Sequence, residues 1–284
     1  MKMTNNFLDN KSAISTIWNS KSLLFSNQDS LCMQLPSVSK LLSFLTGRYE
    51  NGAWIKRAYA SINASKVNLD NSHQQFLSID IDTAQKLYVD GFSLCFGDLS
   101  SAIEDIYALK KQALATFDYE ELIAVTAYFS PPRAIGVLHF DRQHNFFIQR
   151  EGSKRWFVSE KAAIENPYTN LVYSGLSQDF FDDMKAKGYN ILLPNQCGKK
   201  VYELKPGDVL YIPPGFYHSP ETLDHPSLHY TLTIEPACFW EDFNKALFSK
   251  MLSSKGKFNL DYRFLNQADK EKLISDCMQY FFNK

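Results

Sequence analysis

Hydrophobic residues near the start of the chain follow two kinds of spacing. Between Val38 and Leu45 they recur every three or four residues, which predicts an amphipathic helix that we expect Gly47 to end. Residues 54–60 have the pattern of a short strand, and residues 80–88 have that of a second helix. This part of the chain therefore mixes helices with short strands.

The pattern then changes to a series of strands. Residues 92–96 predict a buried strand, and residues 99–117 predict a helix with Ser100 or Ser101 as its N-cap. Short apolar segments between turn residues predict further strands at 122–129, 136–140, 145–149, 154–158, 201–204, 209–212 and 228–234. Many short strands with proline and glycine turns between them are typical of a β-sandwich or barrel.

Two segments depart from this strand pattern. Residues 159–200 form a long, weakly patterned insert, and loops of that length are usually functional or carry small elements of their own. Beyond residue 238 the spacing is again helical, at Phe243, Leu247, Met251, Leu273, Cys277 and Tyr280. We therefore expect residues 1–87 to pack on a core formed by residues 88–238, with residues 239–284 as a short C-terminal helical segment.

Composition and charge exclude several classes of protein. Lysine and arginine number 30 against 31 acidic residues, and a net charge of −1 gives no strong signal for nucleic-acid binding. No run approaches the roughly 20 apolar residues of a transmembrane helix, and the N-terminus lacks the apolar segment of a signal peptide. The five cysteines form no C-x-x-C pair, so they predict neither a disulfide framework nor a zinc knuckle. We therefore expect a cytoplasmic protein without a membrane partner.

The segment that ends at Asp141 carries the clearest chemistry. In a strand, His139 and Asp141 are two residues apart and share one face. A carboxylate turned into a barrel is costly unless a cation neutralises it, and a divalent metal would do so. His218, after a strand and a Pro-Pro-Gly turn, is the candidate third ligand of a facial triad that leaves open positions on iron(II). Taken alone, the His-x-Asp pair also fits a surface histidine beside an acidic residue.

Several motifs, in the expected order, resemble those of the JmjC-domain oxygenases. His139 begins HFDRQHNFFIQREGSKRW, and PGDVLYIPPGFYH, which ends at His218, matches the second half of the family motif. Thr126 begins TAYFSPP, similar to the strand before the first metal histidine, and Ser227 begins the closing strand SLHYTLT. The likeness is strongest to the asparaginyl hydroxylase of hypoxia-inducible factor and to the ribosomal oxygenases, and it extends over about residues 88–240.

The resemblance implies a fold and a ligand set. The fold would be mainly β within the α+β class: a double-stranded β-helix (jelly-roll or cupin) core, N-terminal helices and a C-terminal helical segment. Iron(II) would be held by His139, Asp141 and His218, the catalytic residues. Lys154 stands where the family has a lysine or arginine that pairs with the far carboxylate of 2-oxoglutarate. An isolated lysine at a hairpin would otherwise be expected in solvent.

Three further residues match family positions near the cosubstrate. Thr126 stands where ribosomal oxygenases have an asparagine, a departure that still leaves a hydroxyl able to donate. Ser227 matches a serine that contacts the cosubstrate. Asn145 matches an asparagine of the hypoxia-factor hydroxylase that lies just outside its ligand set, although an amide at a strand edge would fit equally. With Lys154, these residues are the expected binding site for 2-oxoglutarate.

The implied activity is that of an iron(II)- and 2-oxoglutarate-dependent dioxygenase. It would consume O2 and 2-oxoglutarate, hydroxylate an amino-acid residue in a protein or peptide, and release succinate and CO2. Two alternatives remain open: a hydroxylase of a small molecule, such as a free amino acid or a natural-product intermediate, and a non-catalytic metal-binding cupin.

The expected partners follow from the same resemblance. Ribosomal oxygenases have a dimerisation region and a winged helix after the barrel, whereas 44 residues (284 − 240) follow Trp240. We expect that segment to be too short for both, which weakens the expectation of a ribosomal substrate. A homodimer through the C-terminal helices is expected by analogy.

Overall fold

The computed structural model describes residues 6–50, 58–61, 76–78, 81–97, 99–101, 103–117, 123–173, 176–236 and 266–282. These belong to two compact units, Met1–Pro236 and Ala237–Lys284. The start of the strand expected at 54–60 lies outside the described residues, as do Phe243, Leu247 and Met251. In the second unit the described residues form helix α8 (Gln267–Phe282), in the segment where helical spacing is predicted.

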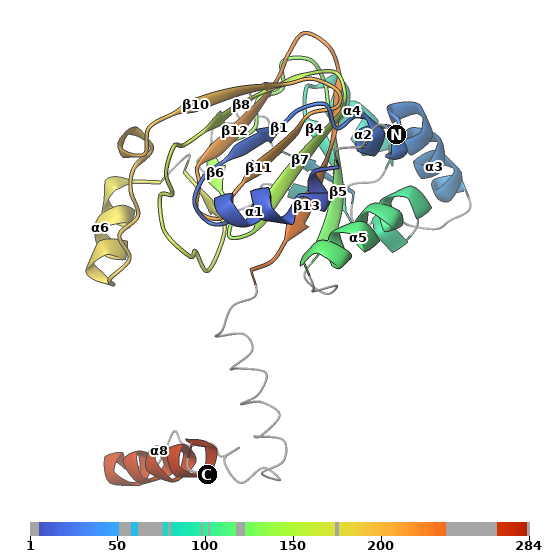
Figure 1. The fold of residues 1–284 in the computed structure, drawn as a ribbon. Coiled ribbons are helices and arrows are strands. Elements are labelled where there is room, and N and C mark those ends of the chain that lie inside the picture. Colours follow the sequence, from blue (N-terminus) through green and yellow to red (C-terminus); the bar gives the residue numbers. More distant parts are fainter. Residues whose placement is uncertain are drawn as a thin grey trace. The chain divides into compact units, whose positions relative to one another are not determined.

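Two antiparallel sheets form the centre of the first unit (Figure 1). The larger sheet has the strand order β1-β11-β7-β13-β5-β4-β2-β3, and the smaller has the order β10-β8-β12-β6-β9. The strands of the larger sheet are β1 (Leu23–Phe25), β2 (Ala58–Ser61), β3 (Phe76–Ser78), β4 (Ser93–Phe96), β5 (Ile123–Ser130), β7 (His144–Glu151), β11 (Val209–Ile212) and β13 (Ser227–Ile234). Those of the smaller sheet are β6 (His139–Phe140), β8 (Lys154–Val158), β9 (Leu171–Val172), β10 (Lys200–Leu204) and β12 (His218–Thr222). The prediction of a mainly β fold with added helices is confirmed.

The two faces of the larger sheet pack against different elements, and a single strand contributes side chains to both faces. In β7, Phe146 and Ile148 point into a core shared with the N-terminal helices, while Phe147 packs with Trp156 of the smaller sheet. This alternation follows from the two-residue period of a strand. The first face of the sheet is therefore covered by helices, and the second faces the smaller sheet.

The helices are short and lie mainly before β5. They are α1 (Lys11–Ile17), α2 (Asp29–Gln34), α3 (Val38–Glu50), α4 (Ile81–Val89), α5 (Glu104–Phe117) and α6 (Gln178–Ala186), with 3-10 turns η1 (Phe7–Asp9), η2 (Leu99–Ser101) and η4 (Pro194–Gln196). In the part of the chain that the structure describes, no helix has both the length and the hydropathy that a bilayer crossing requires.

Three boundaries differ from the sequence-based predictions. Helix α3 continues past Gly47 to Glu50, because a glycine costs a helix only about 1 kcal/mol and does not by itself end one. Ser100 and Ser101 lie in the 3-10 turn η2 and do not cap α5, which begins at Glu104. Strand β6 covers only the last two residues of the segment predicted at 136–140, so Asp141 lies just beyond it.

Several elements have no clear signal in the sequence. Strand β12 has the sequence HSPET, in which the usual run of apolar strand residues is missing, and it is a strand because it pairs with β8 and β6 on either side. Strand β1 and helices α1 and α2 were not predicted either. The insert at 159–200 contains β9, α6 and η4, in agreement with the expectation that it carries small elements of its own.

Replacing Phe146 by alanine tests the core under the helices. The side chain is fully buried, and its ring packs 4.9 Å from that of Phe7 and 4.8 Å from that of Tyr211. We expect Phe146→Ala to lower the free energy of unfolding by about 3–5 kcal/mol, measured by urea denaturation. Tyr168→Ala, at an exposed aromatic residue, should change it by less than about 0.5 kcal/mol. Equal effects of the two substitutions would contradict this assignment of the core.

Candidate metal centre and its cavity

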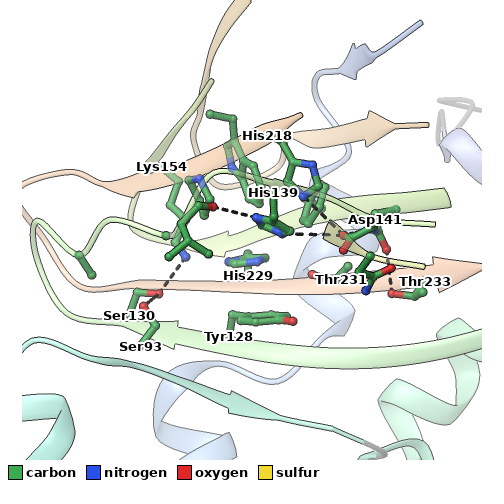
Figure 2. A pocket seen from close by; sticks show the side chains of 18 of the residues that line it. Ser93, Tyr128, Ser130, His139, Asp141, Lys154, His218, His229, Thr231 and Thr233 are labelled. Atoms are coloured by element: carbon green, nitrogen blue, oxygen red, sulfur yellow. Dashed lines mark hydrogen bonds and ion pairs between the residues drawn. The ribbon is translucent and has the colours of Figure 1, made fainter. Parts of the chain in front are cut away.

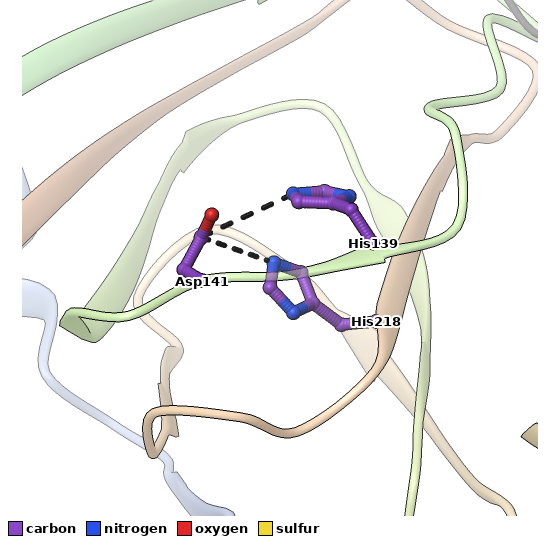
Figure 3. Close-up of side chains that lie close together, drawn as sticks. All are labelled: His139, Asp141 and His218. Carbon is purple, nitrogen blue, oxygen red and sulfur yellow. Dashed lines mark ion pairs between the residues drawn. The ribbon is translucent and has the colours of Figure 1, made fainter. Parts of the chain in front are cut away.

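Three side chains from two segments of the chain converge at one end of the smaller sheet (Figure 3). Strands β6 and β12 pair so that His139 is directly opposite His218, and the ring centroids are 4.2 Å apart. The Asp141 Oδ2 atom lies 4.0 Å from Nε2 of His139 and 3.5 Å from Nε2 of His218. One donor atom from each residue lies within 4.8 Å of the others, so all three can reach a single ion.

Both imidazoles are held in the orientation that a metal ligand requires. Nδ1 of His139 lies 2.8 Å from the carbonyl oxygen of Val137, and Nδ1 of His218 lies 3.0 Å from that of Phe216. A carbonyl can only accept a hydrogen bond, so each Nδ1 carries the proton and each Nε2 has a free lone pair. The two lone pairs belong to the nitrogens that approach Asp141.

The charge states of His139 and Asp141 also fit a cation. Burial, and after it the proximity of His218, lowers the pKa of His139 to about 4, so this imidazole is neutral at pH 7. Burial opposes ionisation of Asp141, but the two histidines and Asn145 together hold the pKa of its carboxyl below the ordinary value. A neutral imidazole beside an ionised carboxylate suits divalent iron, which binds two imidazoles and one carboxylate in open, three-ligand sites.

The Asp141 carboxylate is fixed by its surroundings. Nδ2 of Asn145 donates to its Oδ2 atom at 2.7 Å, and Oδ1 of Asn145 accepts from Oγ1 of Thr233 at 2.9 Å. The backbone is fixed as well, since the N–H of Gly215 donates to the carbonyl of Asp141 at 2.8 Å. That bond ties the segment after β6 to the turn that precedes His218.

The three residues line one end of a cavity of about 260 Å³ between the two sheets (Figure 2). Phe147 and Trp156 form part of its wall, and Tyr128 and His229, whose rings stack at 4.9 Å, lie between its two ends. Three buried polar atoms of the lining have no hydrogen-bond partner among the described residues: Nε1 of Trp156, Nδ1 of His229 and Oγ1 of Thr231. Unsatisfied buried groups are costly, so they indicate that a polar ligand completes the cavity.

Lys154 lies at the other end of the cavity (Figure 2). Its side chain is buried, and Nζ donates to Oγ of Ser130 at 2.8 Å, which also accepts from Oγ of Ser93. No carboxylate of the described residues forms an ion pair with it. Burial therefore lowers the pKa of Lys154 to about 7. A buried ammonium group without a counter-ion is the natural partner of an anionic ligand.

Comparison with known proteins relates this geometry to a family. Residues 105–240 match the model of the JmjC domain. Residues 105–240 are thus similar to a JmjC domain. It is 30% identical to the bifunctional lysine-specific demethylase and histidyl-hydroxylase NO66 of Drosophila willistoni over 146 residues, which cover 50% of this chain and 17% of the fly protein. It is 28% identical to human ribosomal oxygenase 1 over 188 residues, or 63% of this chain and 26% of that protein. The chain thus spans about a quarter or less of these relatives.

Solved structures of one bacterial protein share the fold of this chain. The structure of YcfD, a ribosomal oxygenase from Escherichia coli in complex with cobalt and 2-oxoglutarate, superposes with a TM-score of 0.60 at 17% identity. The superposition covers 98% of this chain and 67% of the bacterial one. A second structure of E. coli YcfD gives a TM-score of 0.59 at 16% identity, covering 98% of this chain and 68% of the other.

The fold brings some of the predicted binding residues to the cavity and leaves others outside it. Lys154 and Asn145 line it, whereas Thr126 and Ser227 do not. The Ser227 hydroxyl instead accepts from Nε2 of Gln149 at 2.8 Å, and Thr126 pairs with Thr231 across β5 and β13. A cosubstrate contact for Thr126 and Ser227 stays a prediction, without support from the lining.

Several residues of the cavity were not predicted from the sequence. Ser130, which binds Lys154, is the most important of them, and Tyr128 is another. The signal was present, because Tyr128 and Ser130 alternate with buried residues along β5 and share a face with Thr126. His229 also lines the cavity, and burial together with the nearby Lys154 lowers its pKa.

Replacing Lys154 by methionine tests the buried ammonium. Its pKa is lower in the folded chain, about 7, than in the unfolded chain, 10.5, so wild-type stability rises with pH across this interval. Without added ligand, we expect Lys154→Met to be more stable than wild type below about pH 7, and the difference to shrink toward pH 10. Urea denaturation across this pH range measures it, with Lys161→Met at an exposed lysine as the control. A constant difference would mean that Lys154 is solvated.

Proposed function

We propose that this protein is an iron(II)- and 2-oxoglutarate-dependent dioxygenase that hydroxylates an amino-acid residue in a protein or peptide. One observation carries the proposal: two imidazoles with free Nε2 atoms, a carboxylate and an unpaired buried ammonium line the same cavity. The first three suit a divalent metal, and the fourth suits a carboxylate. A cofactor with a metal-chelating end and a distant carboxylate satisfies both requirements.

In this proposal, His139, Asp141 and His218 hold the iron, and Lys154 with Ser130 holds the far carboxylate of 2-oxoglutarate. The pair β8–β12 relates the two sites, since Val158 is opposite His218 and Lys154 is opposite Thr222. These two residue pairs lie four residues apart along the strands, which corresponds to about 13 Å between Cα atoms. Side chains that reach inward from both ends leave a gap that suits a short dicarboxylate. The bound iron would supply the activation of O2 that couples decarboxylation of 2-oxoglutarate to hydroxylation.

The chain's own contribution is binding, orientation and exclusion of water. Carbonyl groups fix the tautomer of both histidines, and Asn145 fixes the carboxylate of Asp141. The rings of Phe147 and Trp156 make part of the wall between the ends apolar, which would strengthen an ion pair between Lys154 and a bound carboxylate. Burial raises the pKa of Tyr128 well above its ordinary value, so this phenol stays neutral and can donate a hydrogen bond.

Two observations favour a protein or peptide as the substrate. Proteins similar to this chain include a bifunctional lysine-specific demethylase and histidyl-hydroxylase and ribosomal oxygenase 1, names that indicate action on amino-acid residues. Of the described residues of the insert at 159–200, Asn170 alone lines the cavity, so this part of the insert contributes little to its lining. A cavity that the insert does not close accommodates a polypeptide, whereas a small metabolite would favour a closed lid. We also propose a cytoplasmic setting, because Cys32, Cys95 and Cys197 are free thiols. A homodimer through the C-terminal helices is proposed by analogy.

Succinate formation distinguishes an oxygenase from a non-catalytic metal-binding cupin. Wild-type protein loaded anaerobically with iron(II) and 2-oxoglutarate should form succinate when air is admitted. His139→Ala and Asp141→Ala should lower the rate at least about 100-fold, since even changes around metal ligands cost about 10–100-fold. Removal of the metal by a chelator should have the same effect, reversed by added iron(II).

Matched substitutions at exposed residues serve as controls for this experiment. His225→Ala and Asp179→Ala make the same chemical changes away from the cavity and should keep the wild-type rate. Absence of succinate from the wild-type protein with every substrate mixture would favour the non-catalytic cupin.

The 2-oxoglutarate dependence of turnover tests the ammonium end of the cavity. Lys154→Met removes a charge-assisted hydrogen bond that contributes about 1.5–3 kcal/mol, so the KM for 2-oxoglutarate should rise roughly 10–150-fold. Lys154→Arg keeps a cation and should recover part of the affinity, and the exposed control Lys161→Met should match wild type. An unchanged KM in Lys154→Met would show that the far carboxylate binds elsewhere.

A further inference from the structure

We propose that Gln143 and Asn170, at the metal end of the cavity, recognise a peptide group of the substrate. Gln143 would accept its N–H and Asn170 would donate to its carbonyl. This inference rests on the proposed function and narrows the substrate to a chain with internal amide bonds.

The orientation of the Gln143 amide is fixed by a carboxylate. Its Nε2 atom lies 2.9 Å from Oε1 of Glu235. A carboxylate only accepts hydrogen bonds, so the NH2 end of the side chain must face Glu235. The oxygen end, Oε1, has no partner among the described residues. Because Gln143 lines the cavity, Oε1 is the group that it offers to a ligand.

The orientation of the Asn170 amide is fixed in the opposite sense. The backbone N–H of Arg142 donates to Oδ1 of Asn170 at 2.8 Å. A backbone N–H only donates, so the oxygen end faces Arg142 and the NH2 end is left over. Asn170 is exposed and lines the cavity, which places it at the mouth. The mouth therefore offers one acceptor and one donor, the complement of a secondary amide.

The charges around this pair argue against a free amino acid. Such a substrate carries a carboxylate, which needs a cation near the metal end. Arg142 is already paired with Glu235 at 2.7 Å. Lys154 is the only lysine or arginine among the described residues that line the cavity, and it lies at the far end. A second carboxylate would therefore find no free lysine or arginine of the lining at this end, whereas a neutral peptide group needs none.

Two substitutions remove the group that each amide offers to the cavity and keep the hydrogen bond that orients the side chain. Asn170→Asp keeps the oxygen that accepts from Arg142 and removes the donor toward the cavity. Gln143→Lys keeps a donor toward Glu235 and removes the acceptor. Asn166→Asp, in the same exposed segment, and Gln178→Lys, whose amide donates to Asp182 at 3.1 Å, make the same chemical changes outside the cavity.

The probes are capped pentapeptides, acetyl-Gly-Gly-Xaa-Gly-Gly-amide, one for each amino acid, together with the matching free amino acids. Calorimetry on protein loaded with cobalt(II) and 2-oxoglutarate measures their Kd without turnover, and succinate formation measures their KM. We expect the tightest-binding peptide to lose roughly tenfold in affinity in each of Asn170→Asp and Gln143→Lys, since each leaves one peptide atom unpaired. Both control variants should bind it like wild type.

The possible results separate this inference from the proposed function. Equal Kd values in wild type, Asn170→Asp and Gln143→Lys would overturn the inference. Tighter binding of free amino acids than of capped peptides would overturn it too, as would a failure of the peptides to bind wild type. Peptide binding with the expected losses but without succinate would support the recognition pair and contradict the oxygenase activity.

Discussion

The pairing of His139 with His218 across two short strands fixes where a metal can bind. Strand β6 has two residues and β12 has few apolar side chains, so neither is stabilised by its own sequence. Each depends on its neighbours in the smaller sheet and on the bond from Gly215 to the Asp141 carbonyl. Once this pairing is formed, the carbonyls of Val137 and Phe216 select the tautomers, and the Nε2 lone pairs point to one place.

A second constraint is the separation of opposite charges within one cavity. Asp141 lies at one end and Lys154 at the other, and no described residue gives Lys154 a counter-ion. Burial disfavours the ammonium of Lys154, whereas the neighbours of Asp141 stabilise its carboxylate, so the unfavourable charge burial lies at the Lys154 end. A metal would bind at the Asp141 end, and a carboxylate would give Lys154 a counter-ion. The site thus lowers the stability of the unliganded protein in exchange for affinity, which is common at functional sites.

Strand alternation makes this arrangement compatible with a stable core. Strand β7 contributes Phe146 to the helix-covered core and Phe147 to the cavity wall, and β13 divides its residues in the same way. The strands that carry the ligand-binding side chains are therefore anchored by their other face. This explains how Nδ1 of His229 and Oγ1 of Thr231 remain buried without a hydrogen-bond partner in the described part of the chain: the adjacent apolar residues hold the strand in place.

The sequence by itself determined most strand positions, the candidate triad and the importance of Lys154, because strand periodicity and the family motifs are local patterns. It did not determine strand β12, whose order comes from pairing with residues 60 or more positions away. It also did not distinguish Ser130 from Ser227, since both lie on strands of the same sheet and only packing decides which hydroxyl meets the ammonium group. Asn170 carries no signal at all in the sequence. Its place at the cavity mouth depends on β9 pairing with β6, a long-range contact that tertiary structure alone creates.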